Sequence, residues 1–155
     1  MSDFDGLLPH RPPFLLLDRR LRSDENGLTA SARASSADEL WSRVFAGHYP
    51  GSPIVPGALL CEMAFQAAAA WMVCRPGAVA PPAGRVPVVA RVLGAKFRRP
   101  VAPDEALEVT VAPLEEVGGA TFLKGTVSAG GKPVAHVEFS VAYAPSPAAE
   151  RPAGR

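Results

Sequence analysis

The sequence predicts an α+β domain in which one long apolar helix lies against an antiparallel sheet of about six strands. Residues 57–74 (GALLCEMAFQAAAAWMVC) are apolar on every helical face apart from two side chains, which is typical of a helix surrounded by protein. Residues 88–143 instead hold short runs rich in β-branched side chains, separated by paired glycines at hairpin spacing. With 155 residues that are 48% hydrophobic, we expect one domain over residues 1–145.

The first half of the chain predicts two strands and a short helix before the long one. The apolar run Phe14 to Leu21 and the alternating run Gly27 to Ala34 each have the length of a strand. Residues 35–45 (SSADELWSRVF) follow, and they predict a short helix or turn with Ser36 or Asp38 as its cap.

The helix at residues 57–74 is opened by Pro56 and has two interpretations. About 18 apolar residues is the lower limit for crossing a bilayer. Glu62 near the middle of the helix would cost roughly 2.5 to 3.5 kcal/mol inside a bilayer, and the six alanines would contribute little favourable free energy of insertion. We therefore predict a core helix and no membrane span. Cys61 and Cys74 lie about 20 Å apart along this helix and cannot form a disulfide with each other. The absence of such a disulfide and an acidic N-terminus, which is unlike a signal peptide, both favour a cytoplasmic protein.

Four strands are expected beyond the Pro/Gly-rich linker at residues 76–87. They are Val88 to Val101, Ala106 to Ala112, Thr121 to Ser128 and Val134 to Tyr143, which we expect to form an antiparallel meander. A single sheet must curl about the helix to cover it and then covers one side only, so a second copy is expected to cover the rest. The tail at residues 146–155 has no periodicity and is expected to be disordered.

A histidine and a glutamate flank the start of the long helix. His48 lies in a loop stiffened by proline and glycine, and Glu62 is a carboxylate on an otherwise apolar helix, so together they predict a base and an acid for proton transfer. Gln66, one turn further on, is expected either to orient the acid or to make a structural contact. A lone histidine in a loop is more often solvated, and Glu62 has the structural alternative of a buried partner such as Arg11. We interpret Arg11 and the neighbouring His10 as structural pins.

Three segments of the chain resemble the sequence blocks of the FabZ-type 3-hydroxyacyl-acyl-carrier-protein dehydratases, which have the hotdog fold. They read PHRPPFLLLDR at residues 9–19, GHYPGSPIVPGALLCEMAFQ at 47–66 and AKFRRPVAP at 95–103. The blocks occur in the family's order, and the resemblance covers roughly residues 7–144. It implies a hotdog fold in which the long helix is wrapped by the curled sheet.

The resemblance also implies roles for individual residues. His48 corresponds to the family's base and Glu62 to its second catalytic residue, contributed by different subunits of a homodimer. Gly57 corresponds to the glycine whose amide binds the thioester carbonyl. Glutamate at position 62 favours plain dehydration, because the family's isomerising branch has aspartate there. Tyr49 and Phe65 depart from the family's usual residues, and we expect both to line the acyl tunnel.

Five basic residues and no acidic one lie between Gly84 and Pro103. They form either a solvated strand face or a docking surface for an acidic acyl carrier protein, and we assign docking to Lys96, Arg98 and Arg99. No nucleic-acid motif accompanies them, and the net charge is +1. The three histidines have no metal-ligand spacing, so neither a metal nor another cofactor is expected.

Three functions remain open at this point. The first is dehydration of a 3-hydroxyacyl thioester on an acyl carrier protein, in fatty-acid or polyketide-like synthesis, with His48 as base and Glu62 as acid. The second is a hotdog thioesterase, which would release a free acid without strictly needing His48. The third is a non-catalytic acyl-binding or dimerising module. In each case we expect a homodimer, with a higher oligomer as a further option.

Overall fold

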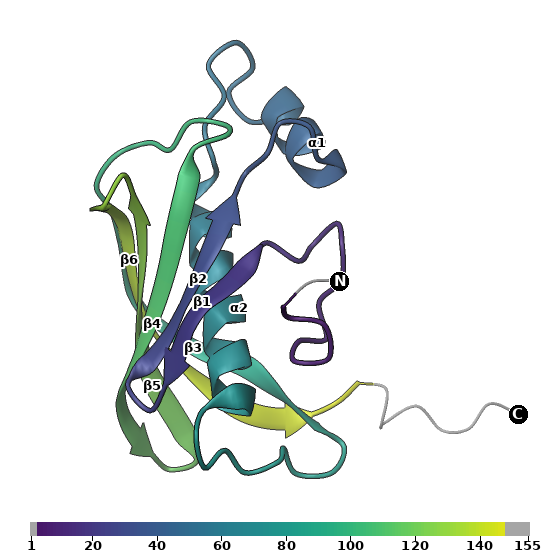
Figure 1. The fold of residues 1–155 in the computed structure, drawn as a ribbon, viewed down its shortest axis with the longest axis vertical. Coiled ribbons are helices and arrows are strands. Elements are labelled where there is room, and N and C mark those ends of the chain that lie inside the picture. The colour runs from purple at the N-terminus through teal and green to yellow at the C-terminus, as the bar shows by residue number, and fades with distance from the viewer. Residues whose placement is uncertain (1–2, 148–155) are drawn as a thin grey trace, which may run out of the picture.

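The computed structural model describes residues 3–147, in which two helices and six strands form one α+β unit (Figure 1). Residues 148–155 of the predicted tail lie outside the described residues. In chain order the elements are β1 (Arg19–Asp24), β2 (Gly27–Arg33), α1 (Glu39–Gly47), α2 (Gly57–Cys74), β3 (Arg85–Phe97), β4 (Ala106–Val117), β5 (Ala120–Ala129) and β6 (Lys132–Pro145).

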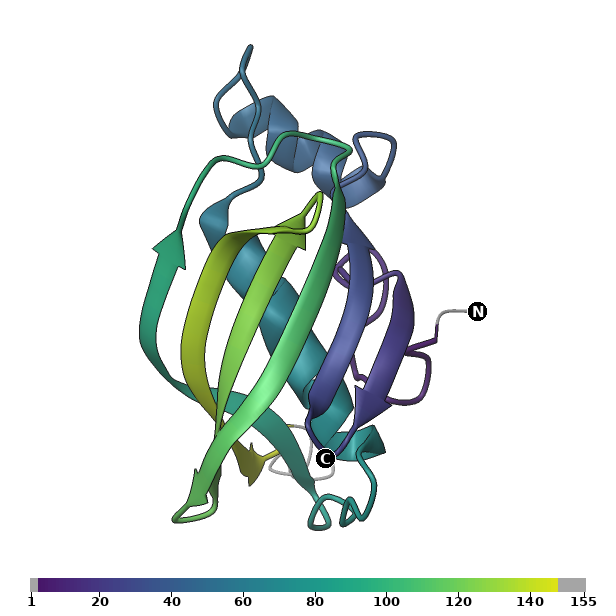
Figure 2. The ribbon, with the colours of Figure 1, turned by 60° about the vertical axis from the view of Figure 1, so that its left-hand side comes forward.

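The six strands form one antiparallel sheet in the order β1-β2-β4-β5-β6-β3 (Figure 2). The predicted meander is confirmed for β4, β5 and β6, whose two turns, Gly118–Gly119 and Gly130–Gly131, have positive φ angles that glycine adopts without strain. The predicted position of the preceding strand is wrong. The chain after β3 crosses the end of the sheet, so β3 pairs with β6 and forms an edge instead of lying beside β4.

Helix α2 has the predicted bounds and lies across one face of the sheet (Figure 1). It contacts β2, β3, β4, β5 and β6, and its buried side includes Met63, Ala64 and Trp71. The helix approaches β5 closely at Gly125, where an added Cβ atom would lie 2.6 Å from the Cβ of Ala64. The sheet is open, with β1 and β3 at its edges; it is not curled as predicted, but it covers one side of the helix only, as expected of a single sheet.

The N-terminal segment before β1 covers another part of α2 (Figure 1). The strand predicted at Phe14 to Leu21 is wrong in its first half, because regular pairing begins only at Arg19. Leu16 and Leu17 are buried, but the amide of Leu16 donates to a helix side chain, and Phe14 N donates to the carbonyl of Arg11 in a turn. Side-chain and turn hydrogen bonds therefore replace a strand ladder here.

Helix α1 is held at its start by a contact from the far half of the chain. Asp38 occupies the predicted N-cap position but makes no capping hydrogen bond. Ser36, the other predicted cap, donates from its hydroxyl to Asp104 at 2.7 Å and from its amide at 2.9 Å. Asp104 adopts φ of 67°, a left-handed conformation that aspartate tolerates in turns.

One helix in the described residues is long and apolar enough to cross a membrane by composition alone. That helix is Gly57–Cys74, and 61% of it is buried inside the protein. This agrees with the prediction of a core helix. Its two cysteines are free, as their separation required.

Candidate active site

His48 follows α1 directly, and its ring is fixed by the loop that it begins. Nδ1 lies 3.1 Å from the carbonyl oxygen of Ile54, and the ring of Tyr49 meets the imidazole edge-on at a centroid distance of 4.8 Å. A carbonyl oxygen can only accept a hydrogen bond, so Nδ1 carries the proton. In the neutral ring the lone pair is then on Nε2, and this tautomer can act as a base through Nε2.

A cavity of about 450 Å³ lies at the N-terminal end of α2. Its lining includes Gly57, Leu60 and Phe97, and the residue that precedes the helix, Pro56, offers no side-chain cap. An added Cβ atom at Gly57 would lie 2.9 Å from the Phe97 ring, so glycine allows this ring to pack against the start of the helix. The first amides of a helix have no intrahelical acceptor, and the helix dipole favours negative charge beside them.

Glu62 lies on the partly uncovered side of α2, and its side chain is 23% exposed. Its Oε1 atom accepts a hydrogen bond from Gln66 Nε2 at 3.0 Å and lies 3.6 Å from Nε2 of His10. The carboxyl group borders a second cavity, of about 230 Å³, whose lining also includes Phe65 and Val88. The contact with His10, over 52 positions of sequence, was missed because no local pattern signals it.

Gln66 is completely buried and connects α2 to the N-terminal segment. Its Oε1 accepts from the amide of Leu16 at 2.9 Å, and its Nε2 donates to the carbonyl of Phe14 at 2.9 Å as well as to Glu62. The side chain is a structural contact and also a hydrogen-bond donor to the carboxyl group.

The structure places the remaining sequence-predicted residues in different surroundings. Phe65 lines the cavity beside Glu62 and meets Phe139 edge-on, whereas Tyr49 is 64% exposed. Arg11 donates to the backbone carbonyls of Leu8 and His10 and makes no ion pair with Glu62, which fits the predicted pin.

His48 and Glu62, both within the described residues, form no hydrogen bond or ion pair with one another in a single chain. The residues lining the cavity beside Glu62 do not include His48. One chain therefore does not bring the two predicted catalytic groups into contact.

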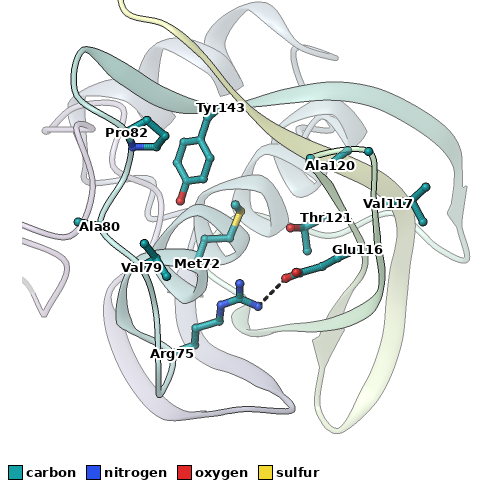
Figure 3. Close-up of a pocket in the computed structure, with 12 residues that line it drawn as sticks. Met72, Arg75, Val79, Ala80, Pro82, Glu116, Val117, Ala120, Thr121 and Tyr143 are labelled. Atoms are coloured by element: carbon teal, nitrogen blue, oxygen red, sulfur yellow. Dashed lines mark hydrogen bonds and ion pairs between the residues drawn. The ribbon is translucent and has the colours of Figure 1, made fainter.

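A further cavity, of about 350 Å³, lies at the C-terminal end of α2 and holds none of the predicted site residues (Figure 3). Arg75 reaches across it to Glu116 at 2.8 Å, and its guanidinium group also stacks on the Trp71 ring at 4.6 Å. Both charges of the cavity are thus already paired. Among residues 3–147, no group of three or more His, Cys, Asp and Glu side chains is arranged to hold a metal ion.

The predicted basic residues at the end of β3 separate into two kinds. Arg99 is committed to a two-bond pair with Glu105, at 3.0 and 2.8 Å. Lys96 and Arg98 instead border a hollow of about 390 Å³ whose lining also includes Lys124, on β5, and His136, on β6.

Burial, and then the charges of Arg98, Lys124 and Lys96, lower the pKa of His136 below its ordinary value. The sequence missed Lys124, because only the pairing of β5 with β6 brings it beside the others.

Comparison with known proteins identifies relatives over most of the chain. Residues 8–138 match the family model described as FabA-like domain. A 3-hydroxyacyl-[acyl-carrier-protein] dehydratase FabZ from Symbiobacterium thermophilum is 36% identical over 143 residues, which are 91% of this chain and 96% of the relative.

Solved structures are similar in fold. A dehydratase heterocomplex from Xenorhabdus doucetiae matches with a TM-score of 0.64 and 18% identity, covering 93% of this chain and 91% of that one. A hypothetical thioesterase with coenzyme A from Streptococcus pneumoniae matches with a TM-score of 0.60 and 9% identity, covering 83% and 86%. At these identities the likeness shows the fold alone, and it agrees with the hotdog fold that the sequence resemblance implied.

Proposed function

The chain belongs to the FabA-like family, and from that premise we propose that it dehydrates a 3-hydroxyacyl thioester on an acyl carrier protein. The products are the trans-2-enoyl thioester and water. The observation that carries this proposal is a carboxyl group held by Gln66 beside an apolar cavity, in a chain whose His48 is bonded through Nδ1 to a carbonyl oxygen. We assign the reaction to fatty-acid synthesis, with a polyketide-like pathway as the alternative, and to the cytoplasm.

His48 is the base in this scheme. A proton alpha to a thioester is weakly acidic, so its removal needs a base in fixed position. The bond from Nδ1 to the Ile54 carbonyl orients the ring and leaves Nε2 to take the proton.

Glu62 is the acid. The C3 hydroxyl departs poorly as hydroxide, and a carboxylic acid beside an apolar cavity supplies the proton that turns it into water. Acid and base are sufficient for this redox-neutral reaction, so the scheme uses no metal or redox cofactor.

The thioester carbonyl binds at Gly57. Negative charge develops on this oxygen when the alpha proton is removed, and a helix N-terminal amide stabilises such charge. Gly57 lines the cavity at the start of α2, so a carbonyl bound in that cavity would lie beside the helix N-terminus.

The working enzyme is a homodimer that completes each site with residues from both subunits. Edge strand β3 pairs with β6 on one side only, and five large apolar side chains along it are exposed: Val88, Val89, Val92, Leu93 and Phe97. A long apolar edge of this kind favours pairing with another strand. A second copy here would cover the open side of the Glu62 cavity, and His48 from that copy would supply the base missing beside Glu62.

The acyl carrier protein docks on the basic residues around the end of β3. Lys96 and Arg98 are free to meet an acidic partner, and Lys124 adds a third positive charge to a hollow whose one carboxylate is that of Glu138. Arg99 contributes less, because Glu105 already binds its guanidinium group. Phe65 lines the acyl chain's cavity, and Tyr49 lies at the solvent side of the base.

Mass spectrometry of a 3-hydroxyacyl-carrier-protein incubated with the protein tests the function. Loss of one water, absent in His48→Ala and Glu62→Gln, is the expected result. Release of free acid would instead identify a thioesterase, and an unchanged substrate across several chain lengths would identify a binding module.

Mixing the two variants tests the shared site. If His48 and Glu62 come from different subunits, random reassembly of equal amounts restores about a quarter of the sites. No recovery after verified subunit exchange would assign both residues to one subunit.

Charge reversal tests docking. Lys96→Glu and Arg98→Glu should each raise KM for the carrier-protein substrate about tenfold and leave the N-acetylcysteamine thioester unaffected. Arg43→Glu, an equal charge change at an exposed position on α1, is the matched control. Equal losses with both substrates would contradict docking at β3.

A further inference from the structure

The amide group of Gln66 has only one possible orientation. The backbone N–H of Leu16 can only donate, so the atom that it meets is the amide oxygen; the carbonyl of Phe14 can only accept, so the atom that it meets is the amide nitrogen. The group that reaches Glu62 is therefore an N–H donor, at 3.0 Å from Oε1.

This orientation distinguishes the two carboxyl oxygens of Glu62. An oxygen that accepts an N–H bond cannot direct its own O–H at the same donor. When Glu62 is protonated, the proton accordingly resides on Oε2, and Oε1 is the carbonyl-like oxygen. Among the described residues, the hydrogen bond from Gln66 and the approach of His10 are both to Oε1 and not to Oε2.

His10 approaches the same oxygen. Its Nε2 lies 3.6 Å from Oε1, and its side chain is 28% exposed, but its Nδ1 atom is buried and has no hydrogen-bond partner among the described residues. A buried N–H without an acceptor is more costly than a lone pair without a donor. Nδ1 is therefore unprotonated, and the N–H of the neutral ring is on Nε2, facing Glu62.

The segment that carries His10 is held independently of Glu62. Arg11 donates to the carbonyl of His10 and to that of Leu8, each at 2.7 Å. The imidazole also lies 6.4 Å from the ring of Phe14, whose carbonyl accepts from Gln66. A distance of 3.6 Å exceeds that of a hydrogen bond, and contacts of this kind tighten when substrate binds.

We propose that His10 is a positioning residue which, together with Gln66, holds Oε1 of Glu62, so that Oε2 delivers the proton to the departing hydroxyl. This inference rests on the proposed dehydration and specifies the oxygen that acts. The Oε2–H bond breaks as hydrogen joins the C3 oxygen, and the C3–O electron pair leaves with the water formed. The alpha C–H electrons become the double bond, and that proton goes to His48. Glu62 is left as a carboxylate whose charge the two N–H donors at Oε1 stabilise.

Steady-state kinetics of His10→Phe and His10→Gln tests this role. The wild type is measured first, because failure to dehydrate any carrier-protein thioester would refute the proposed function and not the role of His10. In an active enzyme, His10→Phe should lower kcat about 10- to 100-fold and leave KM nearly unchanged. His10→Gln keeps an N–H donor and should recover most of kcat.

Two further readouts separate positioning of the acid from a structural role. A 3-fluoroacyl thioester has a leaving group that needs less protonation, so the loss caused by His10→Phe should shrink with it. With the same 3-fluoroacyl substrate, on which Glu62→Gln keeps measurable activity, the double variant His10→Phe/Glu62→Gln should be no slower than Glu62→Gln alone, because His10 acts through Glu62. Equal losses with both leaving groups, additive losses in the double variant, or wild-type kcat in His10→Phe would each overturn the proposal.

Should His10→Phe fail to fold, His10→Ala takes its place, with and without free imidazole. Imidazole should restore kcat by entering the vacated space and donating to Oε1. A folded His10→Ala variant with wild-type kcat, or one that imidazole does not rescue, would also overturn the proposal.

Discussion

Replacing Gln66 by methionine removes one amide group and tests whether it connects α2 to the N-terminal segment. Methionine has similar length and helix propensity, so the change deletes hydrogen bonds with little change in volume. The amide of Leu16 would lose its partner in a buried position, and the carbonyl of Phe14 would lose its partner nearer the surface. An unsatisfied buried group costs about 1–3 kcal/mol, so we expect a loss of about 2–4 kcal/mol in the free energy of unfolding.

Thermal unfolding followed by circular dichroism measures this loss. For a domain of this size, 1 kcal/mol shifts Tm by about 2–4 °C, so Gln66→Met should unfold roughly 5–15 °C below wild type. Protein concentration must be equal in all samples, because assembly contributes to Tm. Arg43→Met, a polar-to-apolar change at an exposed helix position, should shift Tm by only about 1 °C. A Gln66→Met protein whose Tm equals that of the Arg43→Met control would refute the assignment of these hydrogen bonds.

Three other changes have defined outcomes. Gly125→Ala should destabilise the fold by about 1–3 kcal/mol through its clash with Ala64; in denaturant unfolding, adding Ala64→Gly should cost less than the sum of the two single changes, and strict additivity would argue against the clash. Hydrogen bonds from Ser36 lower the pKa of Asp104 in the folded protein below its unfolded value of about 3.9. The ionised carboxylate therefore stabilises the fold at any pH above about 3.9, and this stabilisation is lost as the pH falls through the lower, folded pKa. Ser36→Ala should thus lower Tm at neutral pH and converge with wild type in acid, whereas a pH-independent gap would contradict this. Gly57→Ala should reduce kcat/KM about 10- to 100-fold with little change in Tm, because the added methyl group displaces either the Phe97 ring or the bound thioester. An unchanged kcat/KM would show that Gly57 is not part of the site.

Local composition predicted the elements that depend on neighbours in sequence. Helix α2 has the predicted bounds because Pro56 and the Arg-Pro-Gly sequence after Cys74 act on adjacent backbone groups. The paired glycines predicted both hairpins of β4, β5 and β6 for the same reason. Features that depend on distant partners were not predictable, and the edge position of β3 is the main example, since strand order is decided by packing over the whole sheet.

The candidate site divides in the same way. The frame around His48 and the isolated carboxyl of Glu62 are visible as patterns of residues, whereas the contact of His10 with that carboxyl is not. The apolar run from Phe14 to Leu17 has the composition of a strand, but Gln66 binds its backbone groups and keeps it out of the sheet. A buried polar side chain in an apolar helix was the only signal for this outcome.

The attachment of the N-terminal segment through Gln66 also affects how the protein loses activity on heating. Segments held without a strand ladder open at lower free energies than the central strands of a sheet. Opening this segment would remove the hydrogen-bond partners of Gln66 and carry His10 away from Glu62 while α2 and the sheet stay folded. Amide hydrogen exchange at Leu16 would then be faster than in β5, and heat inactivation would precede the loss of secondary structure.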